Sequence, residues 1–509
     1  MGATAYPKGI GLSLWAFVFV GLLLSAGRHP VDGDARQMCL VASQLDRAAL
    51  GTPSRSRIDM VQGSDGLWYS KYPLGPVLQC RLSQQLSQLG PTDPDAPATR
   101  LLMATAPAAV AALVALGFFM LATTLGFGPV MALPMSLALV FTTHLFAYGR
   151  ILHSEGLQAA AVVFCLHGWI GIRRDPSPRR LLLGGALLGL APHAKATLLI
   201  LSPIALAYFL FAHRGRSQLR ELLLYGGAGA LPPLALWAAY NHLRFGSMVE
   251  LGYLTERDAA LGFSTPLLSG LHGLLLSPGK SLFLYAPVTL LSVLGVRSMW
   301  REARLEAAFV LAPCAILLLL AATWWSGHGD WGWGPRLLIA ALPALLVPAL
   351  YALRGSRRRF RLFQALAACG LVINLLGIVV YHADYLGLLT RVTVPSLVPD
   401  PQQGRGVRDD LVVAHFVPEF SPVVGHGWML WRHLEGKPFD SHDDYPWKSL
   451  RIPAWRLTKE HDPMTSELNH FSDGSATGWS LAVLLSLAWL ALGVRIAQRA
   501  KAKNLRRIE

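Results

Sequence analysis

The stretch LLMATAPAAVAALVALGFFMLATTL, residues 101–125, decides the fold class of this chain. It contains no charged side chain, and a helix of about 20 mostly apolar residues is long enough to cross the hydrocarbon core of a membrane. Eleven other apolar segments share this character: residues 10–26, 129–148, 156–172, 181–192, 196–212, 222–240, 281–296, 307–325, 337–353, 362–381 and 479–494. The sequence therefore predicts an all-α polytopic membrane protein with a bundle of about 12 transmembrane helices.

Two parts of this assignment have a second interpretation. Residues 181–212 form one apolar stretch that would be about 48 Å long as a straight helix, so we expect two short helices that meet at residues 192–195. Residues 10–26 follow Lys8 and end in small residues, a pattern also found in cleaved signal peptides. An uncleaved first span and a signal peptide both remain open for this segment.

The composition agrees with a membrane protein. Of the 509 residues 53% are apolar and 15% are charged, whereas soluble proteins average roughly 25% charged residues. The formal net charge of +15 would point to nucleic-acid binding in a soluble domain. Five short segments explain it instead: residues 173–180, 213–221, 297–306, 354–361 and 495–509 hold 21 Lys and Arg residues against five Asp and Glu residues.

The positive charge predicts an orientation. Short cytosolic loops are enriched in Lys and Arg, and twelve spans that start from a cytosolic N-terminus place all five basic segments in the cytosol. We therefore expect an integral membrane protein with both termini cytosolic and no nucleic-acid partner. Three long stretches, residues 27–100, 241–280 and 382–478, then lie outside, together with the aromatic loop 324–336.

The first external stretch, residues 27–100, contains two predicted amphipathic helices. Apolar residues recur there at helical spacing: Met38, Val41, Leu45 and Ala48 in one helix, and Leu78, Leu82, Leu86 and Leu89 in the other. Such helices lie in the membrane surface. Cys39 and Cys80 are both expected to be external and could pair, but the sequence does not settle the connectivity.

Several short motifs follow one another in an order typical of one enzyme family. They are DGD at 32–34, YSKYPLG at 69–75, NHLRFG at 241–246 with ELGY at 250–253, LSPGK at 276–280 and WGWGPR at 331–336. With these motifs the chain resembles the GT-C glycosyltransferases, which use polyprenyl-phosphate-linked sugars. Within them it is most similar to bacterial protein O-mannosyltransferases and lipid A aminoarabinose transferases.

The resemblance implies a division of the chain. Residues 1–381 are expected to form a GT-C-like transmembrane catalytic domain, with residues 27–100 as its first external loop. Residues 382–478 are expected to form an external C-terminal segment or small subdomain. Residues 479–509 are expected to form a last transmembrane helix and a basic cytosolic tail.

The resemblance also implies an acidic residue in the first external loop as the catalytic base. Asp34 matches this position, with Asp32 in reserve, but Ala35 stands where many relatives have a second acid. Glycosyl transfer needs such a base to take the proton of the acceptor hydroxyl. The alternative is that Asp34 only caps the helix that follows it, as Asp commonly does.

A second acidic position is implied near the donor phosphate or a bound metal. Glu155 fits it, with His153 as a neighbour. The alternative is that Glu155 only interacts with the positive end of a helix dipole. One His and one or two carboxylates can bind a divalent ion, but their spacing matches no metal motif, so we predict no metal and no other cofactor.

Basic and aromatic residues supply candidate substrate contacts. Lys195, Arg244 and Arg336 are candidate ligands of the donor phosphate. A charged residue inside an apolar stretch is costly and usually functional, which favours Lys195; the alternatives are a lysine that reaches to the interface and arginines that anchor helices there. Trp331, Trp333 and Tyr72 are candidate sugar contacts, although Trp is also common at membrane interfaces.

These observations predict a membrane glycosyltransferase. It would transfer a sugar from a polyprenyl-phosphate donor to an acceptor hydroxyl of a lipid, glycan or protein on the external face, and the resemblance implies inversion at the anomeric carbon. The alternative is a secondary transporter or flippase of envelope precursors, a class that also has about twelve spans. Transporters tend to have internal repeats and charges at mid-membrane, and the sequence has neither. A non-catalytic subunit for envelope assembly is a third possibility.

Overall fold

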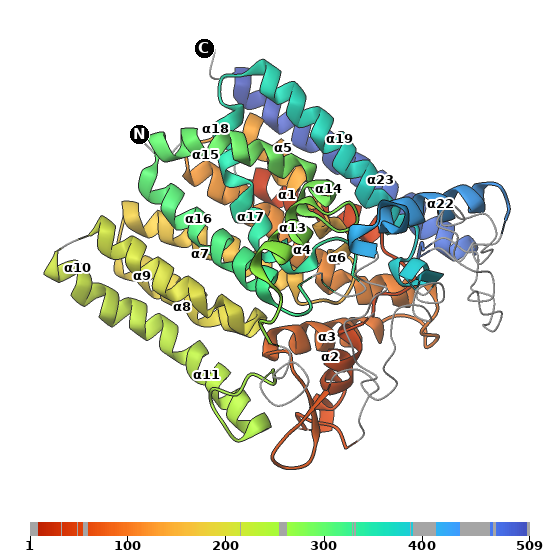
Figure 1. The fold of residues 1–509 in the computed structure, drawn as a ribbon, viewed down its shortest axis with the longest axis horizontal. Helices are drawn as coiled ribbons and strands as arrows, with labels where there is room; N and C mark the ends of the chain where they lie inside the picture. Colours follow the sequence, from red (N-terminus) through yellow and green to blue (C-terminus); the bar gives the residue numbers. More distant parts are fainter. Residues whose placement is uncertain are drawn as a thin grey trace.

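The computed structural model is a bundle of helices with a smaller unit at one end, built from α2 (Ala35–Ala42), α3 (Leu74–Ser87) and a β-hairpin (Figure 1). It describes residues 9–31, 33–47, 49–53, 60–213, 215–253, 262–327, 329, 332–386, 388–389, 414–437, 469–471 and 475–505. The helices of the bundle are α1 (Ile10–Leu24), α4 (Pro97–Thr124), α5 (Pro129–Phe141), α6 (Leu145–Tyr148), α7 (Glu155–Arg174), α8 (Pro178–Ala194), α9 (Leu201–Ala212), α10 (Arg216–Glu221), α11 (Gly227–Phe245), α13 (Leu267–Leu276), α14 (Leu282–Tyr285), α15 (Leu290–Glu302), α16 (Arg304–Thr323), α17 (Leu342–Leu345), α18 (Val347–Leu353), α19 (Arg357–Val379) and α23 (Ala476–Leu505). Four short turns extend or join them: η2 (Ala196–Ile200), η3 (Leu222–Gly226), η4 (Pro287–Thr289) and η5 (Arg336–Ala341).

Six helices of the described chain are long and apolar enough to cross a membrane, and a seventh is added if the two helices that meet at 44° after Arg336 count as one broken span. All twelve predicted segments are helical. Several are shorter than a span, however, such as α1 with 15 residues and α5 with 13. The protein is therefore a helical membrane protein, but helix length does not confirm the predicted number of twelve spans.

The break predicted within residues 181–212 is confirmed. Helix α8 ends at Ala194, Lys195 has an extended backbone with φ −163° and ψ 136°, and η2 begins at Ala196. The extended residue changes the direction of the chain between α8 and α9. Lys195 is thereby placed at the end of a helix instead of inside one.

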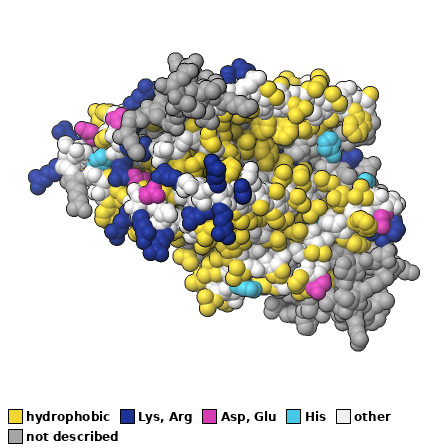
Figure 2. All heavy atoms as spheres, turned by 90° about the horizontal axis from the view of Figure 1, so that it is seen from above, with side chains coloured by type: hydrophobic (Ala, Val, Ile, Leu, Met, Phe, Trp, Pro, Cys, Tyr) yellow, Lys and Arg dark blue, Asp and Glu magenta, His cyan; other side chains and the backbone are white. Residues whose placement is uncertain are grey.

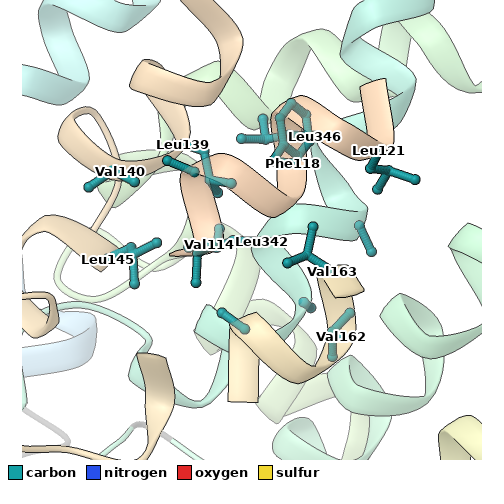
Figure 3. Packing of buried hydrophobic residues seen from close by; sticks show 14 of the residues in the cluster. Val114, Phe118, Leu121, Leu139, Val140, Leu145, Val162, Val163, Leu342 and Leu346 are labelled. Carbon is teal, nitrogen blue, oxygen red and sulfur yellow. The ribbon is translucent and has the colours of Figure 1, made fainter. Parts of the chain in front are cut away.

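The core of the bundle lies where α4, α5, α7 and α17 meet (Figure 3). Phe118, Leu139, Val163 and Leu342 are fully buried there. Large apolar side chains also cover the outside of the molecule; Leu231 of α11 is 66% exposed. A continuous apolar outer surface is what a bilayer requires of the helices that it surrounds.

The basic segments lie together at one end of the bundle. Arg173 of α7 pairs with Glu306 of α16, and Arg354 pairs with Glu302 at the end of α15. Arg499 of α23 donates to the carbonyl of Gly9 just before α1. Figure 2 shows Lys and Arg side chains gathered over the left half of one face and a broad hydrophobic surface over the rest.

The first external stretch folds as a compact unit with α2 (Ala35–Ala42), η1 (Leu45–Arg47), β1 (Met60–Gln62), β2 (Trp68–Ser70) and α3 (Leu74–Ser87). The two strands pair antiparallel, with Val61 opposite Tyr69. This hairpin departs from the all-α prediction, because its aromatic and β-branched residues pair across a turn that uses Gly66 at a φ of +81°.

The two predicted amphipathic helices are present with altered limits. Helix α2 ends at Ala42, before Leu45, and Ala48 lies outside the described residues. In α3, Leu78 and Leu82 are each 49% exposed. The leucine stripe of α3 thus faces away from the bundle, as expected for a helix that lies in the membrane surface.

Parts of the other external stretches are also helical. Helix α13 lies within residues 241–280, which we expected to form a loop, and packs against α16. In the stretch 382–478, η6 (Pro418–Phe420) precedes α22 (Pro422–Leu434), which packs against α19. Tyr385, Phe420 and Met429 form a small apolar cluster there with Val380. The described parts of this stretch are therefore packed on the bundle.

Residues 469–471 join the ends of two distant helices. The amide of Asn469 donates to the carbonyl of Val379 at the end of α19 (2.7 Å), and the amide of Phe471 donates to the carbonyl of Ala26 just after α1 (3.0 Å). The side chain of Asn469 also accepts from the amide of Arg28 (2.9 Å), 441 residues away in the chain. This short segment fixes the point at which the first external stretch leaves the bundle.

Candidate functional site

Asp34 lies at the start of α2 and contacts two side chains from distant parts of the chain. The hydroxyl of Tyr72 donates to Oδ2 of Asp34 at 2.5 Å, and Nη1 of Arg336 donates to the same oxygen at 2.8 Å. No hydrogen bond caps the helix through this carboxylate. The capping alternative therefore does not describe Asp34, whose carboxylate belongs to a polar cluster.

The cluster extends from Arg336 to the start of α7. Nη1 of Arg336 also lies 3.6 Å from Oε1 of Glu155, and Oε2 of Glu155 lies 3.4 Å from Nδ1 of His153. The side chains of Glu155 and His153 are 4% and 7% exposed, so both are largely removed from water. Glu155 is the first residue of α7, as the helix-dipole alternative requires, but its carboxylate is also directed to Arg336.

Lys195 meets the cluster through Tyr72. Its ammonium group lies 4.7 Å from the centre of the Tyr72 ring and 4.8 Å from the centre of the Tyr253 ring, and it donates to the Tyr253 hydroxyl at 2.5 Å. The ammonium group of Lys71 lies 5.4 Å from the centre of the same Tyr253 ring. Ammonium groups are attracted to the faces of aromatic rings, so the two tyrosines hold two lysines beside Asp34.

Close packing of α3 on α8 brings Tyr72 to Lys195. A Cβ atom added to Gly75, in the first turn of α3, would lie 2.5 Å from the carbonyl oxygen of His193 in the last turn of α8. Only glycine allows this approach. Gly33, the residue before Asp34, has a φ of +48°. Glycine adopts this backbone conformation without strain, and it sets the direction in which the chain enters α2.

The charges around Asp34 set its protonation state. Burial raises the pKa of its carboxyl, but Arg336, Lys71, His153 and the Tyr72 hydrogen bond together outweigh burial and hold the pKa well below its usual range. Burial and the negative charge of Asp34 raise the pKa of Tyr72 above its usual range. Asp34 is therefore ionised and Tyr72 protonated, as their hydrogen bond requires.

Arg244 lies outside this cluster. Its guanidinium donates to the carbonyl oxygens of Ser70 (2.6 Å) and Tyr72 (3.0 Å) and to the side chain of Asn241 (2.7 Å), and the residue is 1% exposed. The predicted role of Arg244 as a phosphate ligand is therefore not supported by its contacts. It fastens the chain between β2 and α3 to α11.

One of the predicted sugar contacts, Trp333, is also buried in the structure. Trp333 is 1% exposed and donates to Asn374, and its ring packs against His426 and Tyr285. Trp333 is a core residue, so the structure corrects its prediction as a sugar contact. Asp32 and Trp331 lie outside the described residues.

Sequence reasoning missed three members of the site. Lys71 and Tyr253 were part of motifs but were given no role. Gln37, one turn after Asp34, is fully buried, and its side-chain oxygen Oε1 accepts from the Ser70 hydroxyl and the backbone amide of Lys71. The sequence offered one signal for Lys71, namely a charged residue between the tyrosines at positions 69 and 72. Nothing in the sequence places Tyr253 near Lys71.

Among the described residues, no group of three His, Cys, Asp or Glu side chains is arranged to hold a metal ion. Nη1 of Arg336 lies between the carboxylates of Asp34 and Glu155, where it already supplies a positive charge. We assign no step of the chemistry to a metal.

The chain is similar to known proteins in structure and not in sequence. No protein-family model and no curated protein sequence matches the chain. Solved structures that are similar to it include ArnT from Cupriavidus metallidurans bound to undecaprenyl phosphate and the archaeal oligosaccharyltransferase AglB from Archaeoglobus fulgidus in complex with an inhibitory peptide and a dolichol-phosphate.

The two similarities cover most of the chain at low identity. ArnT is 16% identical with a TM-score of 0.48, over 97% of this chain and 76% of ArnT. AglB is 12% identical with a TM-score of 0.43, over 89% of this chain and 61% of AglB. Neither similarity identifies individual residues or the reaction. The function proposed for this chain therefore rests on its polar cluster.

Proposed function

We propose that the protein is an integral-membrane glycosyltransferase that moves a sugar from a polyprenyl-phosphate donor to an acceptor hydroxyl, with inversion at the anomeric carbon. One observation carries this proposal. Tyr72 contacts both the Asp34 carboxylate and the Lys195 ammonium group. An ionised base and a cation are thereby held on the same tyrosine side chain. Transfer from a lipid phosphate requires a base for the acceptor and a cation for the phosphate to lie this close together.

Asp34 is the proposed general base. Its Oδ2 is used by Tyr72 and Arg336, while Oδ1 makes no hydrogen bond within the described residues. The acceptor hydroxyl donates to Oδ1 and its oxygen attacks the anomeric carbon. As that bond forms, the bond from the sugar to the phosphate oxygen breaks, its electron pair stays on the phosphate, and the hydroxyl proton passes to Oδ1. The products are the glycoside and the polyprenyl phosphate.

Lys195 and Lys71 are the proposed phosphate ligands. The leaving phosphate gains negative charge in the transition state, and preorganised cations stabilise such charge most in a site with little water. Arg336 remains with the two carboxylates, where it holds Asp34 ionised. Arg336, which was predicted to bind phosphate, is therefore assigned to Asp34 instead. Of the predicted phosphate ligands, only Lys195 is retained.

The low pKa of Asp34 has a consequence for the reaction. A weakly basic carboxylate accepts a proton late, once the attacking acceptor oxygen has become acidic through its bond to the anomeric carbon. We infer that cleavage of the sugar–phosphate bond is far advanced before the proton moves. Stabilisation of the departing phosphate by the lysines is then the larger contribution to catalysis.

The position of the cluster favours an enzyme over the transporter alternative. Asp34, Tyr72 and Lys71 belong to the surface unit of residues 27–100, and Lys195 and Glu155 lie at helix ends. Transporters gather such residues near the bilayer midplane. We place the site on the external face of a bacterial inner membrane, with both termini in the cytosol and a lipid, glycan or protein as acceptor.

A single substitution tests the base. Asp34→Asn in the full chain, supplied with polyprenyl-phosphate-linked sugars and hydroxyl acceptors, is expected to lose about 10²- to 10⁴-fold of the transfer rate. Asp46→Asn is the matched control, because Asp46 is a carboxylate of the same surface unit whose side chain is 57% exposed and paired with Arg81. Transfer by Asp34→Asn at the rate of Asp46→Asn would overturn the assignment.

A further inference from the structure

Two cysteines face each other behind the polar cluster. Cys39 of α2 and Cys80 of α3 are 7% and 1% exposed, and both belong to the apolar cluster that contains Met38, Val77 and Tyr72. Helices α2 and α3 pack against one another, and the side-chain amide of Gln84, one turn after Cys80, donates to the backbone carbonyl of Cys39 at 2.9 Å. The neighbouring Cys39 thiol and burial both raise the pKa of the Cys80 thiol. Both are free thiols in the structure.

The position of this pair relates to Asp34 and Tyr72. Helix α2 begins directly after Asp34, and α3 begins two positions after Tyr72. The Asp34–Tyr72 hydrogen bond joins these two segments at one end, and the two thiols meet farther along the same helices. A covalent bond between the thiols would fix the separation of the two segments.

We propose that Cys39 and Cys80 form a disulfide bond in the native membrane that fastens α2 to α3. The inference rests on the external orientation proposed for residues 27–100, because disulfides persist in oxidising compartments. It uses no assumption about the sugar or the acceptor. The remaining cysteines do not compete: Cys165 and Cys314 are buried in α7 and α16, and Cys369 is exposed on α19.

The bond forms by thiol–disulfide exchange with an oxidised dithiol protein, which serves as the oxidant. The more exposed Cys39 loses its proton and attacks a sulfur of the oxidant, whose other sulfur leaves as a thiolate. Cys80 then loses its proton and attacks Cys39 in the mixed disulfide. The product is the Cys39–Cys80 bond, and two electrons and two protons have passed to the oxidant, which ends as a dithiol.

Thiol counting in the full chain tests the bond. Membranes are treated with an alkylating reagent at once on lysis, and the protein is denatured, purified and weighed intact. The chain has five cysteines, so we expect three alkylated thiols before reduction and two more after reduction, with peptide mapping that assigns the late pair to Cys39 and Cys80. Five alkylated thiols before reduction would overturn the proposal.

A second measurement uses the thermal stability of the oxidised protein in detergent. Cys39→Ser, Cys80→Ser and the double variant each remove the same bond, so the apparent melting temperature is expected to fall by the same amount in all three, and a reductant is expected to lower only the wild type. Additive shifts of the two single variants would overturn the proposal. Neither readout involves glycosyl transfer, so their failure is separate from failure of the proposed enzyme activity.

Discussion

The ammonium group of Lys195 lies 4.7 Å from the centre of the Tyr72 ring. The two residues are more than a hundred positions apart: Tyr72 belongs to the surface unit of residues 27–100, just before α3, and Lys195 directly follows the end of α8. Their contact unites the first external stretch with the break between α8 and α9. The ring of Tyr72 serves Lys195 and its hydroxyl serves Asp34, so the two functions of this side chain can be separated by substitution.

Tyr72→Phe is expected to lower kcat with little change in KM for the lipid donor. It removes the hydroxyl that donates to Asp34 and keeps the ring beneath Lys195. A hydrogen bond to a charged group contributes about 1.5–3 kcal/mol, so the loss is expected to be about tenfold to a hundredfold. Steady-state kinetics check this.

Tyr72→Leu is expected to lower kcat further and to raise KM for the donor as well. It removes the ring, and a cation–π contact contributes roughly 0.5–2 kcal/mol to the position of the ammonium group. Identical kinetics of the Phe and Leu variants would show that the ring has no part in holding Lys195.

Arg336→Gln is expected to shift the acid limb of the pH–rate profile to higher pH. Asp34 accepts a proton only when ionised, and in the wild type its pKa is held well below the usual range. Burial raises this pKa and Arg336 is the first of the groups that lower it, so the variant raises it. The measurement is kcat/KM against pH; an unchanged acid limb would mean that Asp34 does not set it.

The same substitution has a predictable effect on stability. A carboxyl whose pKa is lower in the folded than in the unfolded protein stabilises the fold above the unfolded pKa, and this contribution disappears as the pH falls through the folded pKa. The wild type therefore keeps the contribution of Asp34 at mildly acidic pH. Arg336→Gln is expected to lose stability there, as measured by thermal unfolding at several pH values.

Gly75→Ala is expected to impair activity although it adds only a methyl group. The new Cβ would lie 2.5 Å from the backbone oxygen of His193, so α3 must move away from α8. Overpacking of this kind costs about 1–3 kcal/mol. Gly171→Ala in α7 is the matched control, because nothing lies within 4 Å of its added Cβ. Equal transfer rates in the two variants would contradict the packing argument.

Arg244→Met is expected to reduce the stability of the fold, whereas Lys195→Gln is expected to reduce binding of the lipid phosphate. Arg244→Met leaves the carbonyl oxygens of Ser70 and Tyr72 without their donor, and an unsatisfied buried group costs about 1–3 kcal/mol. It should therefore lower the melting temperature together with the activity. Lys195→Gln should leave the melting temperature near that of the wild type and weaken binding of polyprenyl phosphate, measured directly; the reverse pattern would exchange the two roles.

Much of the bundle was predictable because apolar length is a local property. The twelve apolar segments, the break at residues 192–195 and the basic end of the bundle follow from hydropathy and charge along the chain. The number of spans was harder, since Pro and extended residues divide apolar segments into short helices. The hairpin at residues 60–70 was missed because strands of three residues carry little periodicity.

The site was predictable in part. Asp34, Glu155, Lys195, Arg336 and Tyr72 were each selected from the sequence, and the structure brings them into one cluster. Their partners were not predictable, because Tyr253 and Lys71 meet only through tertiary packing. Arg244 and Trp333 show the opposite error: both belong to motifs of the external loops, yet their side chains are buried in structural contacts.

The segment 469–471 imposes an order on biosynthesis. A ribosome makes α1 and Asp34 early, but the carbonyl of Ala26 and the amide of Arg28 meet their partners only when residues 469–471 have been translated. Helix α1 also packs along α23, which comes later still. This end of the molecule is therefore completed only after residues 469–471 have been made, and a nascent chain that stops short of these residues carries every member of the polar cluster without the closure that holds their loop in place.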